Sequence, residues 1–432
     1  MKTMAPSDKI ARYRQYNAGR IARAARLNQR KSEVIFTLVP YLLHRNQPDL
    51  PGYVADPACP RGINAYDSAS ANSSRLFQQL FPSARAGGPK TASRPTRPCA
   101  IHSLKTIGSM GTIAQSEKSD CDFWVSVDYG QLGSGGLQLL QQKCAAIEAW
   151  AEATGVETHF FLMDIAQTRT NSFTPPVADK AAACEQKVLL KDELFRTHIL
   201  VAGKPLLWWL IPPGLNEEQY RIEVLRLDRE RSFNQADFVD LGCVTGIPPG
   251  EILDACLWQM NKALASPFKS VIKFAYLELL LQQDGAGVHF FSDKVKRLVT
   301  YPEKLGPGEA RLAPAQIDPY LLLAREVTTF YENSAASLTR QWADLIRECF
   351  FLKTLEDLKG PASKVSGPHN NLREIMEQMT AWDILPKERQ RFLNFRHWQN
   401  QEKQAFAARV NEYLLQTYKR LSRSARGGDL AA

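Results

Sequence analysis

The pattern of apolar and polar positions divides the chain into three parts. Residues 7 to 45 contain few helix breakers and an apolar run near their end, which predicts helix. Beyond Pro212 the pattern is almost wholly helical. Between these parts, short apolar strands alternate with helices. We expect strands at 101–107, 123–127 and 156–163, a helix at 137–153, and two strands within 198–211 separated by the turn at 202–204.

These elements predict an α+β protein in three segments. A helical and loop-rich segment spans 1–99, a core with a mixed sheet spans 100–212, and a large helical domain spans 213–432. The stretch 82–98 is rich in Pro, Gly, Ser and Arg, which is typical of a connection between units. A chain of 432 residues is long enough to bury more than one sizeable core.

Basic residues are concentrated near the start of the chain, whose formal net charge is +9. They lie among alanines, with no acid between the first and last of them: Lys9, Arg12, Arg14, Arg20, Arg23, Arg26, Arg30 and Lys31. A positive balance suits polyanionic partners, which include nucleotide phosphates, nucleic acid and membrane surfaces. Because aromatic residues are not interleaved at base-stacking spacing, we interpret the stretch as a solvated helix face, and a nucleic-acid partner is not expected.

The cysteines and the hydropathy indicate a cytoplasmic protein. The eight cysteines are scattered without a CxxC pair, which argues against a disulfide framework and against a zinc site. No signal peptide opens the sequence, and the most apolar stretch, 206–213, is too short to span a bilayer. We therefore expect reduced thiols and no membrane span.

Candidate chemistry lies in the segment 108–125, GSMGTIAQSEKSDCDFWV. Asp120 and Asp122 stand two apart at the start of a predicted strand, so both side chains project from the same face. Paired carboxylates suit Mg²⁺, with phosphates as further ligands. Gly108 lets the backbone approach a phosphate closely, and Ser109 offers a hydroxyl and an N–H. An isolated pair of acids is usually just solvated, but Gly-Ser twelve residues upstream favours a catalytic site.

This combination, with Ser119 directly before the first aspartate, resembles the signature of the DNA polymerase beta-like nucleotidyltransferase superfamily. Within it, the chain resembles class I adenylate cyclases of enterobacterial type, through the segment above and through 38–54, 139–164, 189–208 and 257–280. The resemblance implies a nucleotidyltransferase core that converts ATP to cyclic AMP and pyrophosphate, with two Mg²⁺ or Mn²⁺ ions held by Asp120 and Asp122. Such cyclases also carry a C-terminal regulatory half that this sequence lacks, so contacts with regulatory proteins through it are not inferred.

The superfamily also implies a third carboxylate on the strand beside the paired aspartates. The predicted strand 156–163 offers Glu157 near its start and Asp164 at its end. Seven residues of strand separate the two by about 23 Å, and their opposite parity turns them to opposite faces. We favour Glu157, because the paired aspartates also lie at the start of their strand, and Asp164 remains the alternative.

Two lysines in the helical part are candidate phosphate ligands. Ser266 and Pro267 are typical of a helix start, which puts Lys269 and Lys273 on one face of the first turns. Cations there are disfavoured by the helix dipole and by each other, and an anion would reverse both effects. Exposed, solubilising lysines are the alternative, and the family resemblance favours phosphate binding.

Three weaker candidates complete the set. Lys204, in the tight turn after 202, is a further candidate phosphate contact. Trp124 shares strand parity with both aspartates and is a candidate to flank the adenine, with a core aromatic as the alternative. Asp192 and Arg196 are four apart on a predicted helix and are expected to form a structural ion pair.

Two other functions remain open at this point. One is a nucleotidyltransferase that passes a nucleotide to an RNA, protein or small-molecule acceptor. The other is a catalytically inactive nucleotide-binding module, against which the intact motif counts. Only a cyclase forms cyclic AMP from ATP and Mg²⁺ with no acceptor present.

Overall fold

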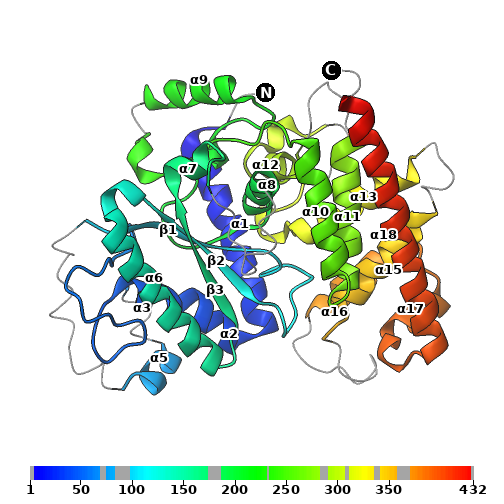
Figure 1. Cartoon of the computed structure of the whole chain (residues 1–432), viewed down its shortest axis with the longest axis horizontal. Coiled ribbons are helices and arrows are strands. Elements are labelled where there is room, and N and C mark those ends of the chain that lie inside the picture. Colours follow the sequence, from blue (N-terminus) through cyan, green and yellow to red (C-terminus); the bar gives the residue numbers. More distant parts are fainter. Residues whose placement is uncertain are drawn as a thin grey trace.

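The computed structural model shows a small mixed sheet joined to a larger helical region, as the predicted α+β class requires (Figure 1). It describes residues 4–68, 74–82, 98–173, 186–230, 233–282, 290–306, 311–334, 341–357 and 370–429. The connection predicted at 82–98 lies almost wholly outside these residues, and Cys184 lies outside them too. The seven described cysteines are free thiols.

Four strands form the sheet in the order β3-β2-β1-β4. β1 (Ile101–Ile107) pairs antiparallel with β2 (Cys121–Val127) and with β4 (Ile199–Gly203), whereas β2 and β3 (Thr158–Asp164) are parallel. The first three predicted strands are confirmed to within two residues. The register sets Ile107 beside Asp122, so the end of β1 and the start of β2 meet at one edge of the sheet.

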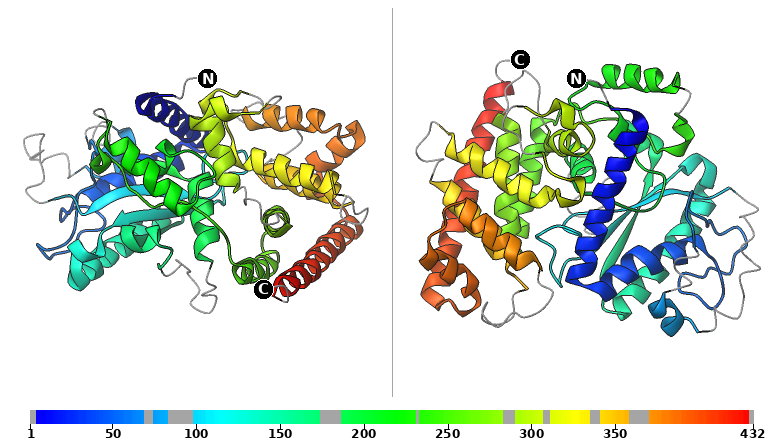
Figure 2. Two further views of the ribbon diagram at one scale, coloured as in Figure 1. Left: turned by 90° about the horizontal axis from the view of Figure 1, so that it is seen from above. Right: turned by 180° about the vertical axis from the view of Figure 1, so that it is seen from behind.

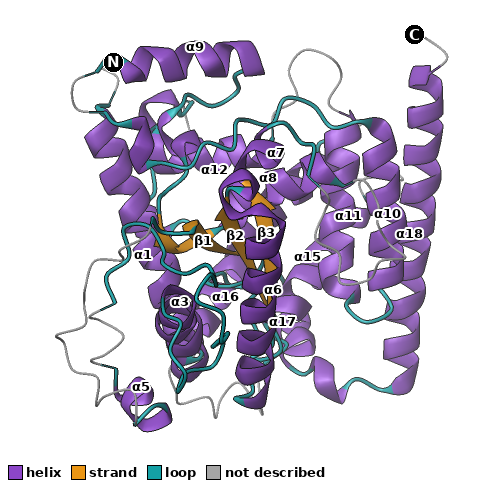
Figure 3. Cartoon of the chain, turned by 60° about the vertical axis from the view of Figure 1, so that its left-hand side comes forward, coloured by secondary structure: helices purple, strands orange, loops and turns teal. Residues whose placement is uncertain are grey.

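Helices cover both faces of the sheet, and Figure 3 shows the strands enclosed between them. On one face Leu104 and Phe123 pack against α6 (Tyr129–Ala153) in a core of their own. On the other face Trp124 belongs to a second core, which also includes residues of α8 (Lys187–Thr197) and of the helical region. The predicted boundary at 212 thus falls within a region of shared packing, because the apolar face of the sheet needs the helical region to bury it.

The predicted N-terminal helix is confirmed as α1 (Pro6–Leu27), α2 (Gln29–Glu33), a π-helical turn η1 (Val34–Leu38) and α3 (Val39–His44), and α5 (Arg75–Leu80) follows. Seen from behind, α1 crosses in front of the strands (Figure 2). Its Asn17 amide donates to the Leu200 carbonyl oxygen at 2.9 Å and accepts from the Leu200 N–H at 2.8 Å. Asn17 therefore occupies hydrogen-bonding groups of the edge strand β4 that a sheet would otherwise leave open.

The interpretation of the basic stretch as a solvated face is wrong for half of its residues. Lys9, Arg20, Arg23 and Lys31 are buried. On α1 the buried basic residues alternate with Tyr13 and Tyr16 at helical spacing, so the stripe that faces the protein is basic and aromatic together. Arg14, Arg26 and Arg30 remain exposed, as predicted.

The region after Pro212 is mainly helical, as predicted, and it forms a bundle beside the sheet (Figure 1). Among the described residues its longer helices are α9 (Glu217–Asp228), α10 (Pro249–Lys262), α11 (Pro267–Gln282), α12 (Phe291–Thr300), α13 (Pro319–Glu332), α15 (Trp342–Thr354), α16 (Asn370–Ala381), α17 (Pro386–Leu393) and α18 (Asn400–Asp429). Short 3₁₀ turns connect some of them, including η10 (Phe395–His397). In the described part of the chain, no helix has both the length and the apolar composition needed to cross a bilayer.

The second strand expected within 198–211 is wrong. After β4 the chain forms a 3₁₀ turn, η5 (Leu207–Leu210), in which every residue is buried. A short, fully buried apolar run has no polar face to reveal its period, so a strand and a turn of helix cannot be told apart from the sequence.

Candidate active site

The Gly-Ser loop and the paired aspartates lie together because the antiparallel pairing of β1 and β2 brings them to one edge of the sheet. Gly108 follows β1 with φ +92°, a backbone conformation that favours glycine, and open space surrounds the position of a Cβ. Ser109 Oγ lies 3.0 Å from Ser119 Oγ, and the latter accepts a hydrogen bond from the Ser116 N–H at 2.9 Å. A hydrogen bond between the Ser109 and Ser119 hydroxyls therefore joins the two ends of the loop.

A cavity of about 970 Å³ opens at this edge, between the sheet and the helical bundle. Gly108, Ser109, Ser119, Asp120 and Asp122 all line it. The opposite walls come from α8, α10, α11, the C-terminal end of α15 and η10, so the cavity lies where the sheet and the bundle meet. The structure thus brings these five predicted residues to one hollow.

The electrostatics of Asp122 are those of an anion without a counterion. Burial first, and the adjacent Asp120 second, raise the pKa of Asp122 to about 6 against the opposing effects of His159 and Lys269. Neither aspartate forms an ion pair with another described residue. A half-buried carboxylate beside a second carboxylate has unfavourable electrostatic energy, which a bound cation would relieve.

Lys269 and Lys273 reach the same cavity from the first turns of α11, which begins at Pro267 as predicted. Lys273 Nζ lies 3.1 Å from the Glu193 carboxylate, whereas Lys269 forms no ion pair with a described residue. Burial alone would raise the pKa of Glu193, but the neighbouring Lys273, Arg196 and Lys269 outweigh it and lower the pKa to about 2. Glu193 thus stays ionised and leaves Lys269 as the cation more available to a phosphate.

Two buried basic residues bind backbone carbonyls of the loop between Gly108 and Asp120. The Arg20 guanidinium donates to three backbone carbonyl oxygens, those of Met110 (2.5 Å), Gly111 (2.8 Å) and Thr197 (3.1 Å). Lys31 Nζ donates to the backbone carbonyls of Glu117 and Ser119, directly before Asp120. These side chains use their hydrogen bonds on backbone oxygens, so they fix the position of the loop instead of facing solvent.

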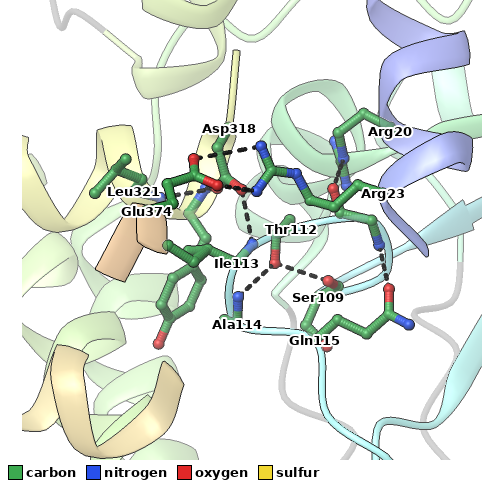
Figure 4. A network of polar contacts seen from close by, with 12 residues as sticks. Arg20, Arg23, Ser109, Thr112, Ile113, Ala114, Gln115, Asp318, Leu321 and Glu374 are labelled. Atoms are coloured by element: carbon green, nitrogen blue, oxygen red, sulfur yellow. Dashed lines mark hydrogen bonds and ion pairs between the residues drawn. The ribbon is translucent and has the colours of Figure 1, made fainter. Parts of the chain in front are cut away.

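A second contact joins the loop to the helical bundle (Figure 4). Asp318 caps α13 by accepting from the N–H of Leu321, and it also accepts from the Ile113 N–H of the loop at 2.7 Å. The Arg23 guanidinium lies 3.6 Å from Asp318 and 2.6 Å from Glu374 of α16. Removing one partner would leave a buried charge unpaired, which is costly. This network therefore stabilises the contact of α1 and the loop with the bundle.

The two candidates for a third carboxylate lie at opposite ends of β3. The parallel register pairs Val127 with Asp164, so Asp164 stands at the far edge of the sheet from Asp120. There Asp164 caps α7 (Ile165–Arg169) and accepts from the Tyr129 N–H at 2.8 Å. Glu157 lies beside Asp120, since its carbonyl accepts from the Cys121 N–H, but its side chain is exposed and does not line the cavity.

Trp124 and Lys204 are not brought to the cavity. Trp124 is completely buried and its ring packs edge-on against Phe173, so the core-aromatic alternative describes it. Lys204 follows β4, whose antiparallel pairing places Gly203 beside Ser103, near the start of β1 and away from Gly108. The Asp192–Arg196 ion pair is present at 3.2 Å, with Asp192 fully buried.

Several residues of the site carry no recognisable sequence signal. Glu193 lies in a helix three residues before Arg196 and looks like any charged surface position. Lys353 and Arg396 line the cavity from more than 200 residues beyond the aspartates. For Arg20 a signal did exist, because it shares a helical stripe with Tyr13 and Tyr16.

The donor set fits a divalent cation in part. Asp120, directly before β2, and Asp122, within it, would supply carboxylate oxygens, and neither forms an ion pair with a described residue. No group of three or more His, Cys, Asp or Glu side chains with metal-binding geometry occurs among the described residues. Two carboxylates suffice where phosphate oxygens and water complete the shell, as is usual for Mg²⁺.

Comparisons with known proteins identify the family of the chain. Residues 7–209 match the family described as adenylate cyclase NT domain, and residues 247–431 match that described as adenylate cyclase, class-I, second domain. Adenylate cyclases of Escherichia coli (strain K12) and Salmonella typhimurium are each 30% identical over 92% of the chain, and that of Pasteurella multocida is 31% identical over 94%.

The chain spans about half the length of these curated relatives: 44%, 44% and 47%. No solved structure matches it. The two family matches follow each other in order, and the first contains the loop and both aspartates while the second contains Lys269 and Lys273. The chain therefore belongs to the class I adenylate cyclase family.

Proposed function

We propose that this chain cyclises ATP to 3′,5′-cyclic AMP and pyrophosphate in the cavity between the sheet and the bundle. The observation that carries the proposal is the convergence of Asp120, Asp122, the Gly108-Ser109 loop and Lys269 on one cavity. Carboxylates that can bind cations lie near backbone and ammonium groups that can bind phosphates. Phosphoryl chemistry on a nucleotide needs this combination. The family membership supports the same reaction.

Each residue has a role that follows from its place. Asp120 and Asp122 would hold two Mg²⁺ or Mn²⁺ ions. When bound, such ions would lower the pKa of the ribose 3′-OH and neutralise the charge of the departing pyrophosphate. The open backbone at Gly108 and the Ser109 N–H would receive phosphate oxygens. Lys269 would bind the phosphates through its ammonium group, and Arg20 and Lys31 keep the loop in position. We also propose that the sheet belongs to the nucleotidyltransferase superfamily, because Gly108-Ser109 and the paired aspartates resemble the signature of that superfamily.

Transfer to an RNA acceptor loses its main support. The basic stretch 9–31 lends this alternative some weight, but Arg20, Arg23 and Lys31 bind backbone oxygens and carboxylates within the protein. The experiment that separates the functions is incubation with ATP and Mg²⁺ alone, followed by chromatography of the products. We expect cyclic AMP without any added acceptor, and an acceptor requirement would contradict the proposal.

A further inference from the structure

The cavity has a wall whose chemistry differs from that of the carboxylate end. Along α10, Ala255, Trp258, Gln259 and Lys262 line it at spacings of three and four residues, so they form one helix face. Phe395 of η10 lines it from the C-terminal part of the chain. This wall offers aromatic rings and an amide rather than paired charges.

The two aromatic side chains provide surfaces for stacking. Trp258 and Phe395 are each only half-buried although their rings are apolar. The ammonium of Lys262 lies 5.0 Å from the Trp258 ring centroid, and Phe395 packs edge-on against Phe268 at 6.3 Å. A flat purine that stacks on either ring would remove apolar surface from water and gain base–aromatic contact.

Gln259 is the polar group of this wall. The residue as a whole is 8% exposed, and its amide makes no hydrogen bond to another described residue. An amide that lines a cavity without a protein partner is free to bind a ligand or water there. A glutamine amide offers one acceptor and two donors, which match the exocyclic N6 amino group and the adjacent ring nitrogen of adenine.

We propose that Trp258 and Gln259 form the adenine subsite, with Trp258 stacking on the base and Gln259 binding its N6 edge. This rests on the proposed function, because it assumes that ATP places its phosphates at Asp120, Asp122 and Lys269. The triphosphate and ribose then occupy the charged end of the cavity, and the neutral base reaches the α10 face. Gln259 is thereby a specificity-determining residue of the cyclase.

Two substitutions separate the two contacts. Gln259→Met keeps the length of the side chain but removes the amide, so it should weaken binding of α,β-methylene-ATP, which cannot cyclise, by about tenfold. It should also lower kcat/KM for ATP by a similar factor. The loss for purine riboside triphosphate should be smaller, because this analogue lacks the N6 amino group and has only the ring nitrogen to lose as a partner of the amide. Trp258→Leu should reduce kcat/KM for ATP and for purine riboside triphosphate by the same factor, because stacking does not depend on the exocyclic group.

Asn261→Met is the matched control, since Asn261 is an exposed amide on the same helix and does not line the cavity. It should leave all constants unchanged. Equal losses on ATP and purine riboside triphosphate in Gln259→Met, or unchanged binding of α,β-methylene-ATP, would overturn the assignment. If the wild-type chain makes no cyclic AMP, the proposed reaction fails, and the binding measurement alone then supports or overturns the subsite.

Discussion

Asp122→Asn should make the protein more stable while it removes the proposed activity. A pKa of about 6 in place of 3.8 means that the folded state disfavours the ionised carboxylate. At about 1.36 kcal/mol per pKa unit, this amounts to about 3 kcal/mol at neutral pH. Solvent reaches the half-buried group and screens part of this, so we expect a gain of about 1–2 kcal/mol from the uncharged amide.

The gain should depend on pH in a defined direction. Between about pH 4 and pH 6 the folded state keeps a proton on Asp122 that the unfolded chain has released, so wild-type stability falls as pH rises through this window. Above about pH 6 the carboxylate is ionised in both states and the difference becomes constant. Below about pH 4 it is protonated in both, and the two proteins should be equally stable with respect to this group.

Thermal unfolding in EDTA at several pH values measures this effect. The variant should unfold at a temperature a few degrees higher than wild type at pH 7.5, and the two should converge near pH 4. Asp49→Asn is the control, because Asp49 is exposed and forms no ion pair with a described residue. Adding Mg²⁺ should stabilise wild type and not Asp122→Asn. A variant that is less stable than wild type at pH 7.5, or a gain that is the same at every pH, would refute the reasoning.

Further predictions concern the phosphate ligands, the third carboxylate and the loop. Lys269→Ala should raise the KM for ATP about tenfold, because a charge-assisted phosphate contact is lost. An unchanged KM in steady-state assays would mean that Lys269 is an exposed, solubilising lysine and not a phosphate ligand. Lys273→Ala should also raise it, as the KM measurement will show. Asp164→Ala should cost about 1 kcal/mol of stability in denaturant unfolding, through the lost cap, and keep its activity; an inactive, folded variant would make Asp164 a site residue. Glu157→Gln, assayed under saturating Mn²⁺ and ATP, should lower the turnover if Glu157 is the third carboxylate, and full activity would exclude that role. Arg20→Met leaves buried carbonyl oxygens unpaired, so it should lower stability by about 3 kcal/mol and reduce turnover, whereas wild-type unfolding and kinetics would contradict its role in holding the loop.

The sheet and the central motif could be predicted because their signals are local. The strand 101–107 lies between Pro98 and Gly108, and the two aspartates stand at the start of the next strand. Pairing of neighbours along the chain is therefore enough to bring them together. The helix start at Pro267 is equally local, and it correctly set Lys269 and Lys273 on one face.

The rest depends on contacts between distant parts of the chain. Spacing cannot show that Asp164 and Lys204 fall at the far edge of the sheet, since that follows from strand direction, which is parallel for β3 and antiparallel for β4. Nor can it show that Glu193 meets Lys273, because their helices are eighty residues apart. Half of the basic stretch 9–31 is buried although charge suggests solvent, because a guanidinium such as that of Arg20 can be buried once backbone oxygens satisfy it.

The central claim is tested most directly by measuring cyclic AMP and pyrophosphate together when the wild-type chain is incubated with ATP and Mg²⁺. Our account predicts that the two products form in equal amounts without an acceptor. It also predicts that Asp120→Asn and Asp122→Asn, shown to be folded by circular dichroism, retain less than about a tenth of this rate, because loss of a metal ligand raises the barrier by more than 1.4 kcal/mol. Pyrophosphate without cyclic AMP, or undiminished cyclic AMP from either variant, would contradict it.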